Sequence, residues 1–203
     1  MTRGLAMRMF SLAATLAVAL LAVGPLAHAS GGAGAQTALE QSHAKVIALA
    51  DADAKPDAIQ REVDLLLDYG WIAQAALGGP SRYAERCAPR CDEFEALLTE
   101  LIRSSYTKRL SAKQRGEVEY VREHVRDTAT KVDTKVRFTT SAGKTKTVEV
   151  DYVMHQIDGR WIVRDIITEK VSLVKTYTHD IHELYQAGGI DRVIEALEAK
   201  LAG

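Results

Sequence analysis

The densest group of chemically capable side chains lies near the C-terminus, where His179, His182 and Glu183 fall within about one and a half turns of a predicted helix. Histidines three residues apart share a helix face, so this group is a candidate metal site. A zinc-binding helix, however, places its histidines four residues apart with a glutamate between them. The spacing therefore favours a solvated polar face, and we predict neither a metal nor a cofactor.

A second candidate group is the trio Asp151, His155 and Asp165, which could act as general acid and base if it converged. Strand alternation places Asp151 and His155 on the face opposite Val150, Tyr152 and Met154, which faces solvent if those three are core. The chain also lacks a G-x-S-x-G elbow, a P-loop and a G-x-G-x-x-G turn. We predict no catalytic residue, and an enzyme that uses Asp165 or His155 as base is a minor alternative.

The N-terminus has the pattern of a secretory signal peptide. Arg3 and Arg8 precede a short apolar run, and Ala27-His28-Ala29 has the small-x-small pattern of a cleavage site. The run is too short to span a bilayer, and the helix-breaking Gly24-Pro25 follows it. We expect cleavage after Ala29, export, and no stable membrane anchor.

The rest of the chain has the length and charge of a single exported domain. We divide it into a cleaved segment 1–29, a flexible glycine-rich lead-in 30–38 and one domain 39–203. The formal net charge of the whole chain is −1, and no basic stripe with interleaved aromatic residues is present. This balance argues against a nucleic-acid partner.

The two cysteines, Cys87 and Cys91, are separated by three residues in "RCAPRCDEF". Pro89 suits the first turn of a helix, which places the cysteines about one turn apart. A thioredoxin-like motif needs two intervening residues, and a zinc site needs further ligands. Thiol pairs usually oxidise after export, so we predict a structural disulfide, with a redox or metal pair as the alternative.

The elements change from helices to strands and back to helices. Helical spacing of apolar residues predicts helices near 39–50, 59–67 and 94–110, and "DADAKPD" separates the first two. Alternation then predicts strands at 132–138 and 148–154, and Asp158-Gly159 predicts a hairpin turn into a third strand. Residues 111–125 form a turn that enters a strand at about Val118.

Two more helices close the chain, separated by Gly188-Gly189, which favours a left-handed stop. Helices before and after an antiparallel meander indicate the α+β class. We therefore predict a curved antiparallel sheet with amphipathic helices packed on one face.

Three stretches in this order resemble the MlaC family, also called the toluene-tolerance auxiliary family. They are "LLLDYGWIAQAALGG", "FEALLTELIRSSYTKRL" with Tyr106 and Leu110 in place, and "WIVRDIITEKVSLVKTYTHDIHELYQAGGIDRVIEAL". The resemblance covers about residues 68–203. It implies a periplasmic phospholipid-binding protein of an ABC transport system that moves lipid between the two membranes and maintains outer-membrane lipid asymmetry.

The sequence departs from the family pattern at three places. Lys170 replaces the glycine of the family's Glu-Gly-Val-Ser, and a positive φ there would strain lysine by about 1 kcal/mol. "CAPRCDEF" replaces a Thr-Pro helix start, and "VREHVRDTATKV" does not match cleanly.

A lipid carrier needs a long, dry pocket, because a two-tailed phospholipid has roughly 30 methylene groups, each worth about 0.8 kcal/mol on burial. The same apolar residues would form a packed core if no ligand were present. The candidates to line an apolar cavity between sheet and helices are Leu97, Leu101, Val136, Phe138, Val150, Tyr152, Val163, Val171, Leu173, Tyr177, Ile181 and Ile194.

The resemblance also implies the partners. They are a phospholipid with buried acyl chains, an inner-membrane ABC transporter complex, and an outer-membrane complex that donates or accepts lipid. The main alternative is a secreted scaffold or binding module with a solid core.

Overall fold

The computed structural model describes residues 34–111, 116–140 and 142–203, with the backbone alone for 106–111. The predicted signal peptide, 1–29, lies outside the described residues. The described helices are α1 (Ala35–Asp51), α2 (Pro56–Asp64), α3 (Tyr69–Ala76), α4 (Pro80–Cys87), α5 (Cys91–Ser111) and α6 (Leu173–Ala202). The strands are β1 (Glu117–Val125), β2 (Thr130–Thr139), β3 (Thr145–Ile157), β4 (Arg160–Thr168) and β5 (Val171–Ser172).

The strands form one antiparallel meander in the order β1-β2-β3-β4-β5, which confirms the predicted α+β class. Asp158 and Gly159 turn β3 into β4 with φ values of 48° and 78°, as expected of a two-residue hairpin turn. Glu169 and Lys170 turn β4 into β5 in the same way, with φ values of 49° and 67°. Lys170 therefore occupies the left-handed conformation that the missing glycine would have adopted freely.

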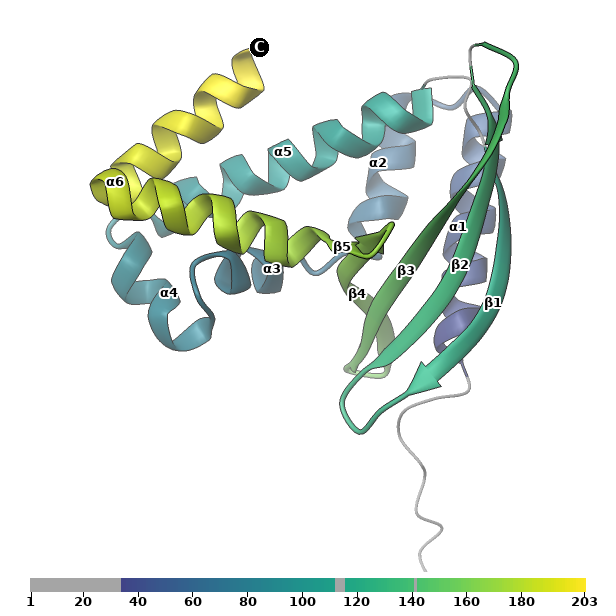
Figure 1. The fold of residues 1–203 in the computed structure, drawn as a ribbon, viewed down its shortest axis with the longest axis horizontal. Coiled ribbons are helices and arrows are strands. Elements are labelled where there is room, and N and C mark those ends of the chain that lie inside the picture. The colour runs from purple at the N-terminus through teal and green to yellow at the C-terminus, as the bar shows by residue number, and fades with distance from the viewer. Residues whose placement is uncertain (1–33, 112–115, 141) are drawn as a thin grey trace, which may run out of the picture.

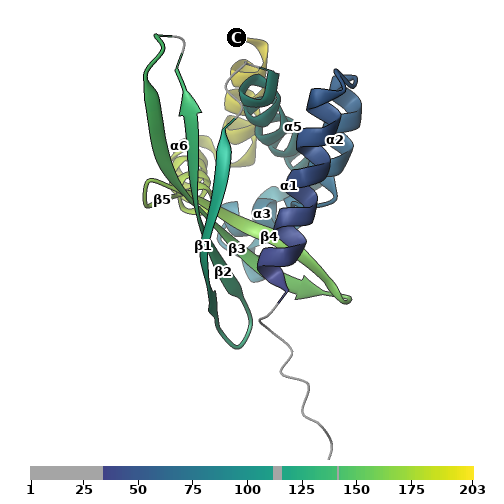
Figure 2. The same cartoon turned by 90° about the vertical axis from the view of Figure 1, so that its right-hand side faces the viewer.

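The helices lie along one side of the strongly curved sheet (Figures 1 and 2). α1 lies against β1, β2 and β4, whereas α3 and α6 pack on β4 and on each other. The largest fully buried apolar side chains come from both layers: Leu39, Ile72, Leu77, Phe94, Leu98, Ile102, Val132, Met154, Val163, Val193 and Ile194. One core therefore joins the helices to the end of the sheet that lies away from the β2–β3 turn.

α1 begins at Ala35, four residues before the predicted domain boundary at Leu39. Ala35 and Leu39 are both fully buried, and Glu123 of β1 accepts a hydrogen bond from the Gln36 backbone N–H at the helix start. The glycines of the lead-in suggested flexibility, but alanine has the highest helix propensity and the sheet supplies a surface on which this turn packs.

α6 is interrupted at the predicted glycine pair. Gly189 has φ 68°, and Gly188 has a non-helical ψ of 27°, so the chain breaks between two helical segments. The first segment starts at the sheet, and the second turns back over α5 in Figure 1. The predicted stop is confirmed.

Residues just before α3 join the helical layer to β4. Val163 exchanges backbone hydrogen bonds with the Leu66–Asp68 segment. Asp68 caps α3 by accepting from the Trp71 N–H at 3.1 Å, and its second oxygen accepts from Arg164 Nε at 2.8 Å. The acidic-aromatic stretch thus fixes α3 against the sheet.

Candidate functional site

The inner face of the sheet is buried at one end only. In β2 this face carries Thr130, Val132 and Thr134, which are at most 1% exposed, and Met154 of β3 is fully buried beside them. The Thr134 hydroxyl donates to the Val150 carbonyl at 2.5 Å, so its polar group is satisfied within the sheet. This end of the face is closed core.

Toward the β2–β3 turn the same face becomes half-exposed while most of its side chains stay apolar, with Lys146 opposite Phe138 at the end. Val136 pairs with Val118 on one side and with Val148 on the other, so the three form one cross-strand row. Val150 and Phe138 flank that row. We call these five residues the open sheet face: Val118, Val136, Phe138, Val148 and Val150.

All five residues of the open sheet face are half-buried, and in the described part of the chain none of them packs against the buried core. In Figure 2 the N-terminal end of α1 lies close to the sheet, and the helix diverges from the sheet toward the β2–β3 turn. Apolar side chains left half-exposed in a row are expected to bind an apolar partner. This is the strongest candidate for a binding surface in the described residues.

The closed end begins at a polar aromatic cluster beneath α1. His43 Nδ1 lies 2.7 Å from the Tyr120 hydroxyl, and the His43 ring makes an edge contact with Tyr152 at 5.3 Å between centroids. Burial lowers the pKa of His43 to about 4 and raises the pKa of Tyr120 to about 12, where the Glu40 charge adds to the effect. His43 is therefore neutral at physiological pH.

The structure brings together only some of the residues predicted to line a lipid site. Val136, Phe138 and Val150 lie on the open sheet face, and Tyr152 lies next along the same face. Leu97 and Tyr177 are half-buried against the core, while Leu173 is half-buried at the start of α6. The structure buries the remaining helix and β4 candidates in the common core: Leu101, Val163, Ile181 and Ile194.

Val171 departs from the expectation, because it is 61% exposed in the short β5 strand. It was a candidate to line the cavity, but the Glu169–Lys170 turn places it opposite Thr168 at the sheet edge. Sequence reasoning also left out Val118, Val148 and His43. Strand register links the two valines to Val136, whereas no local signal marks His43.

Each member of the trio considered as acid and base has a different partner. Asp165 accepts from the Ser172 hydroxyl at 2.6 Å and from the Val174 N–H at 3.1 Å, so it caps the start of α6. Asp151 accepts from Lys131 Nζ at 3.0 Å. His155 lies near the Trp71 ring, where burial and the Arg164 charge lower its pKa.

The outer face of the sheet is charged and paired internally. Asp133 contacts Lys131 at 2.6 Å, His124 at 2.7 Å and Arg122 at 3.1 Å. Burial alone raises the pKa of Asp133, but the hydrogen bonds from these three groups outweigh burial and lower the pKa to about 2. This face is a salt-bridged surface that stabilises the strand pairing.

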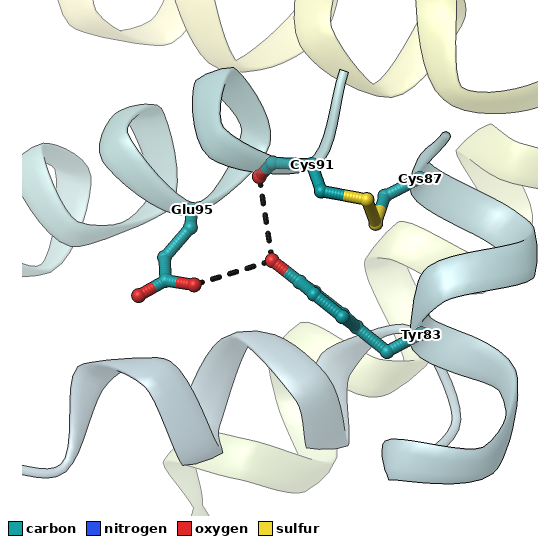
Figure 3. The surroundings of a disulfide bond; sticks show 4 residues. All are labelled: Tyr83, Cys87, Cys91 and Glu95. Carbon is teal, nitrogen blue, oxygen red and sulfur yellow. Dashed lines mark hydrogen bonds between the residues drawn. A yellow bond between two sulfur atoms is a disulfide. The ribbon is translucent and has the colours of Figure 1, made fainter. Parts of the chain in front are cut away.

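Cys87 and Cys91 are joined in a disulfide, as predicted, at the junction between α4 and α5. Figure 3 shows Tyr83 of α4 alongside it, with its hydroxyl donating to the Cys91 carbonyl at 3.3 Å and to Glu95 at 3.2 Å. Cys87 is fully buried. The disulfide and Tyr83 together fix α4 to the first turn of α5.

His179 and Glu183 lie 3.4 Å apart with both side chains largely exposed, as expected of a solvated face. Within residues 34–111, 116–140 and 142–203, no group of three or more histidines, cysteines or acids is placed to hold a metal ion. No helix in those same ranges combines the length and the apolar content that crossing a bilayer demands.

The family model described as "MlaC protein" matches residues 35–199, which is most of the chain. The chain belongs to the MlaC family. The match begins where α1 begins and ends in the last helix, so the whole described domain is the MlaC domain. A comparison with curated proteins gives no sequence match.

Solved structures confirm the fold. A phospholipid-binding protein from Ralstonia solanacearum, solved in complex with a phospholipid, superimposes with a TM-score of 0.69 at 20% identity. The alignment covers 84% of this chain and 98% of that chain. At this level of identity the likeness establishes the architecture, and the ligand named for that protein is its own.

Proposed function

We propose that this MlaC protein is a periplasmic phospholipid-binding shuttle. On this proposal it carries lipid between an inner-membrane ABC transporter complex and an outer-membrane complex that donates or accepts lipid. Residues 1–29 direct export and are removed after Ala29, and residues 39–203 with the start of α1 form the carrier domain.

The observation that carries this proposal is the open sheet face. Its five apolar side chains are half-exposed and continue directly into the buried face of the same strands. Acyl chains covering these side chains would remove apolar surface from water at roughly 25 cal/mol per Å². Membership of the MlaC family and the phospholipid in the Ralstonia structure support a lipid as the occupant.

The acid–base trio favours transport over chemistry. Asp165 is engaged in capping α6 and Asp151 in an ion pair, while His155 lies beside the Trp71 ring. None of the three belongs to the open sheet face. Moving an intact lipid between membranes requires binding and release alone.

The first test is mass spectrometry of protein purified from the periplasm without detergent, under native conditions and again after organic extraction. We expect a stoichiometric adduct that resolves into phospholipid. A bare chain that also fails to take up added phospholipid would contradict the proposal.

A matched pair of variants locates the site. Val136→Asp places a carboxylate on the open sheet face, where an ionised group cannot be covered by acyl chains. Val121→Asp makes the same change on the edge strand, where Val121 is 46% exposed. We expect Val136→Asp to lose bound lipid and Val121→Asp to keep it; equal loss in both would place the site elsewhere.

The shuttle step needs a separate measurement. Lipid-loaded protein is mixed with proteoliposomes that contain either the inner-membrane or the outer-membrane complex, and transfer of a labelled phospholipid is followed over time. We expect transfer with both complexes and little with protein-free vesicles. Transfer that is independent of the complexes would restrict the function to lipid binding.

A further inference from the structure

The His43 cluster lies where an occupant of the open sheet face would have to stop. In β1 and β2 the next cross-strand pair on the same face as Val118 and Val136 is Tyr120 and Thr134. Tyr152 follows one pair further along β3, opposite Val132. His43 of α1 contacts both tyrosine rings, at 5.9 Å to Tyr120 and 5.3 Å to Tyr152 between centroids.

The distance from the open end to this cluster is short. Phe138 and Thr134 are four residues apart on β2, which corresponds to about 13 Å at the usual strand rise. Beyond Thr134 on β2 this face is closed, since Val132 is 0% exposed and Thr130 is also 0% exposed. An acyl chain laid along the open sheet face therefore meets a cluster of three aromatic rings, in tilted and edge contact, before it reaches the core.

The three rings are held in place by contacts on both sides. The His43 to Tyr120 hydrogen bond, at 2.7 Å, fixes α1 to β1, and the edge contact with Tyr152 extends the cluster to β3. The polar groups of His43 and Tyr120 are paired with each other, and Tyr152 meets His43 through its ring. A rigid aromatic surface of this kind stops an acyl chain by occupying space, and no bond to the end of the acyl chain is needed.

We propose that His43, Tyr120 and Tyr152 form the end wall of the acyl-chain site and set the longest chain that the protein accepts. The inference rests on the proposed lipid-binding function and adds a determinant of specificity to it. Removing the His43 ring opens space between α1 and the sheet, so longer chains become accommodated. The preference for longer over shorter acyl chains then rises by up to about fourfold for each additional methylene that becomes buried.

The experiment is a competition for binding. Delipidated protein is incubated with vesicles of phosphatidylethanolamines that differ only in acyl-chain length, and bound lipid is quantified by native mass spectrometry. The test variant is His43→Ala, and the control is Ile47→Ala, one helical turn further along α1 at a site that is 44% exposed. Tyr152→Leu is a second test variant that opens the same wall from the sheet side, and unfolding midpoints identify variants that fail to fold.

We expect wild type and Ile47→Ala to share one chain-length distribution, and at least one folded wall variant to shift several-fold toward longer chains. Unchanged distributions in the folded wall variants would overturn the end-wall assignment while leaving lipid binding intact. A wild type that binds none of the phosphatidylethanolamines would instead overturn the proposed function, together with this inference.

Discussion

The helical core and the open sheet face are built from the same apolar residue types but are packed differently. Phe94 of α5 is fully buried between helices, whereas Phe138 of β2 is half-buried and outside the core. Helices α3, α5 and α6 can approach one another along whole apolar stripes, while the curved sheet diverges from α1 toward the β2–β3 turn (Figure 2). The difference separates side chains that stabilise the fold from side chains that are free to bind.

The largest expected effect comes from the phenylalanine pair. Phe94→Ala leaves a cavity in the core and should lower the free energy of unfolding by about 3–5 kcal/mol. Phe138→Ala removes the same atoms from a half-exposed site, so we expect a loss of about 1 kcal/mol or less. Urea unfolding of delipidated protein measures both, and equal losses would remove the distinction between the two regions.

Acid should weaken the closed end of the sheet through His43. Because burial lowers its pKa from 6.5 to about 4, the unfolded chain takes up a proton over this range that the folded protein does not. Stability should therefore fall as pH drops from 6.5 to 4, by up to about 3 kcal/mol at roughly 1.4 kcal/mol per pH unit.

The check is a series of urea midpoints across this pH range. His43→Leu should flatten the pH dependence, because leucine does not titrate. His179→Leu, at an exposed site on α6, should leave the dependence as it is in the wild type. A wild-type curve that is already flat would contradict the burial of His43.

Two valines of one strand sharpen the comparison further. Val132 and Val136 lie on the same face of β2, with Val132 fully buried and Val136 half-exposed. Val132→Trp should overpack the core and cost about 1–3 kcal/mol of stability. Val136→Trp should cost less stability and instead reduce lipid occupancy, as measured by native mass spectrometry. If Val132→Trp reduced lipid occupancy and Val136→Trp cost more stability, the open part of the face would lie at Val132 and not at Val136.

The smallest expected effect concerns the β4–β5 turn, which belongs to neither region. Lys170 has φ 67°, a conformation that costs a side-chain-bearing residue about 1–2 kcal/mol. Lys170→Gly relieves this strain but increases the freedom of the unfolded chain, so we expect a net gain of up to about 1 kcal/mol. Lys175→Gly, in the first turn of α6, should instead lose stability.

Much of the fold was predictable because it depends on local patterns. Alternation marked β2 and β3, helical spacing marked α5, and the turns at Asp158-Gly159 and Gly188-Gly189 fell where glycine and aspartate favour positive φ. The disulfide between Cys87 and Cys91 was predicted from the expected export of the chain, and the two cysteines are four positions apart. Each of these features depends on residues that are close together in the chain.

The candidate site was only partly predictable, because its residues come from separate strands and helices. Val136, Phe138 and Val150 were expected to face inward, and the structure places them on one face of the sheet. Val163 was expected to face inward as well, but the structure buries it in the core. Nothing in the local sequence marks His43 as the partner of Tyr120, which lies 77 residues away.

The sequence by itself determined the residue types, the order of elements and the face on which each strand places its apolar side chains. Only the tertiary structure decided which part of that face is covered, because coverage depends on where α1 meets the curved sheet and where it diverges from it. Periodicity defines the direction of a side chain, whereas burial requires a second surface at contact distance. Val132 and Val136 share one pattern and differ only in that second surface.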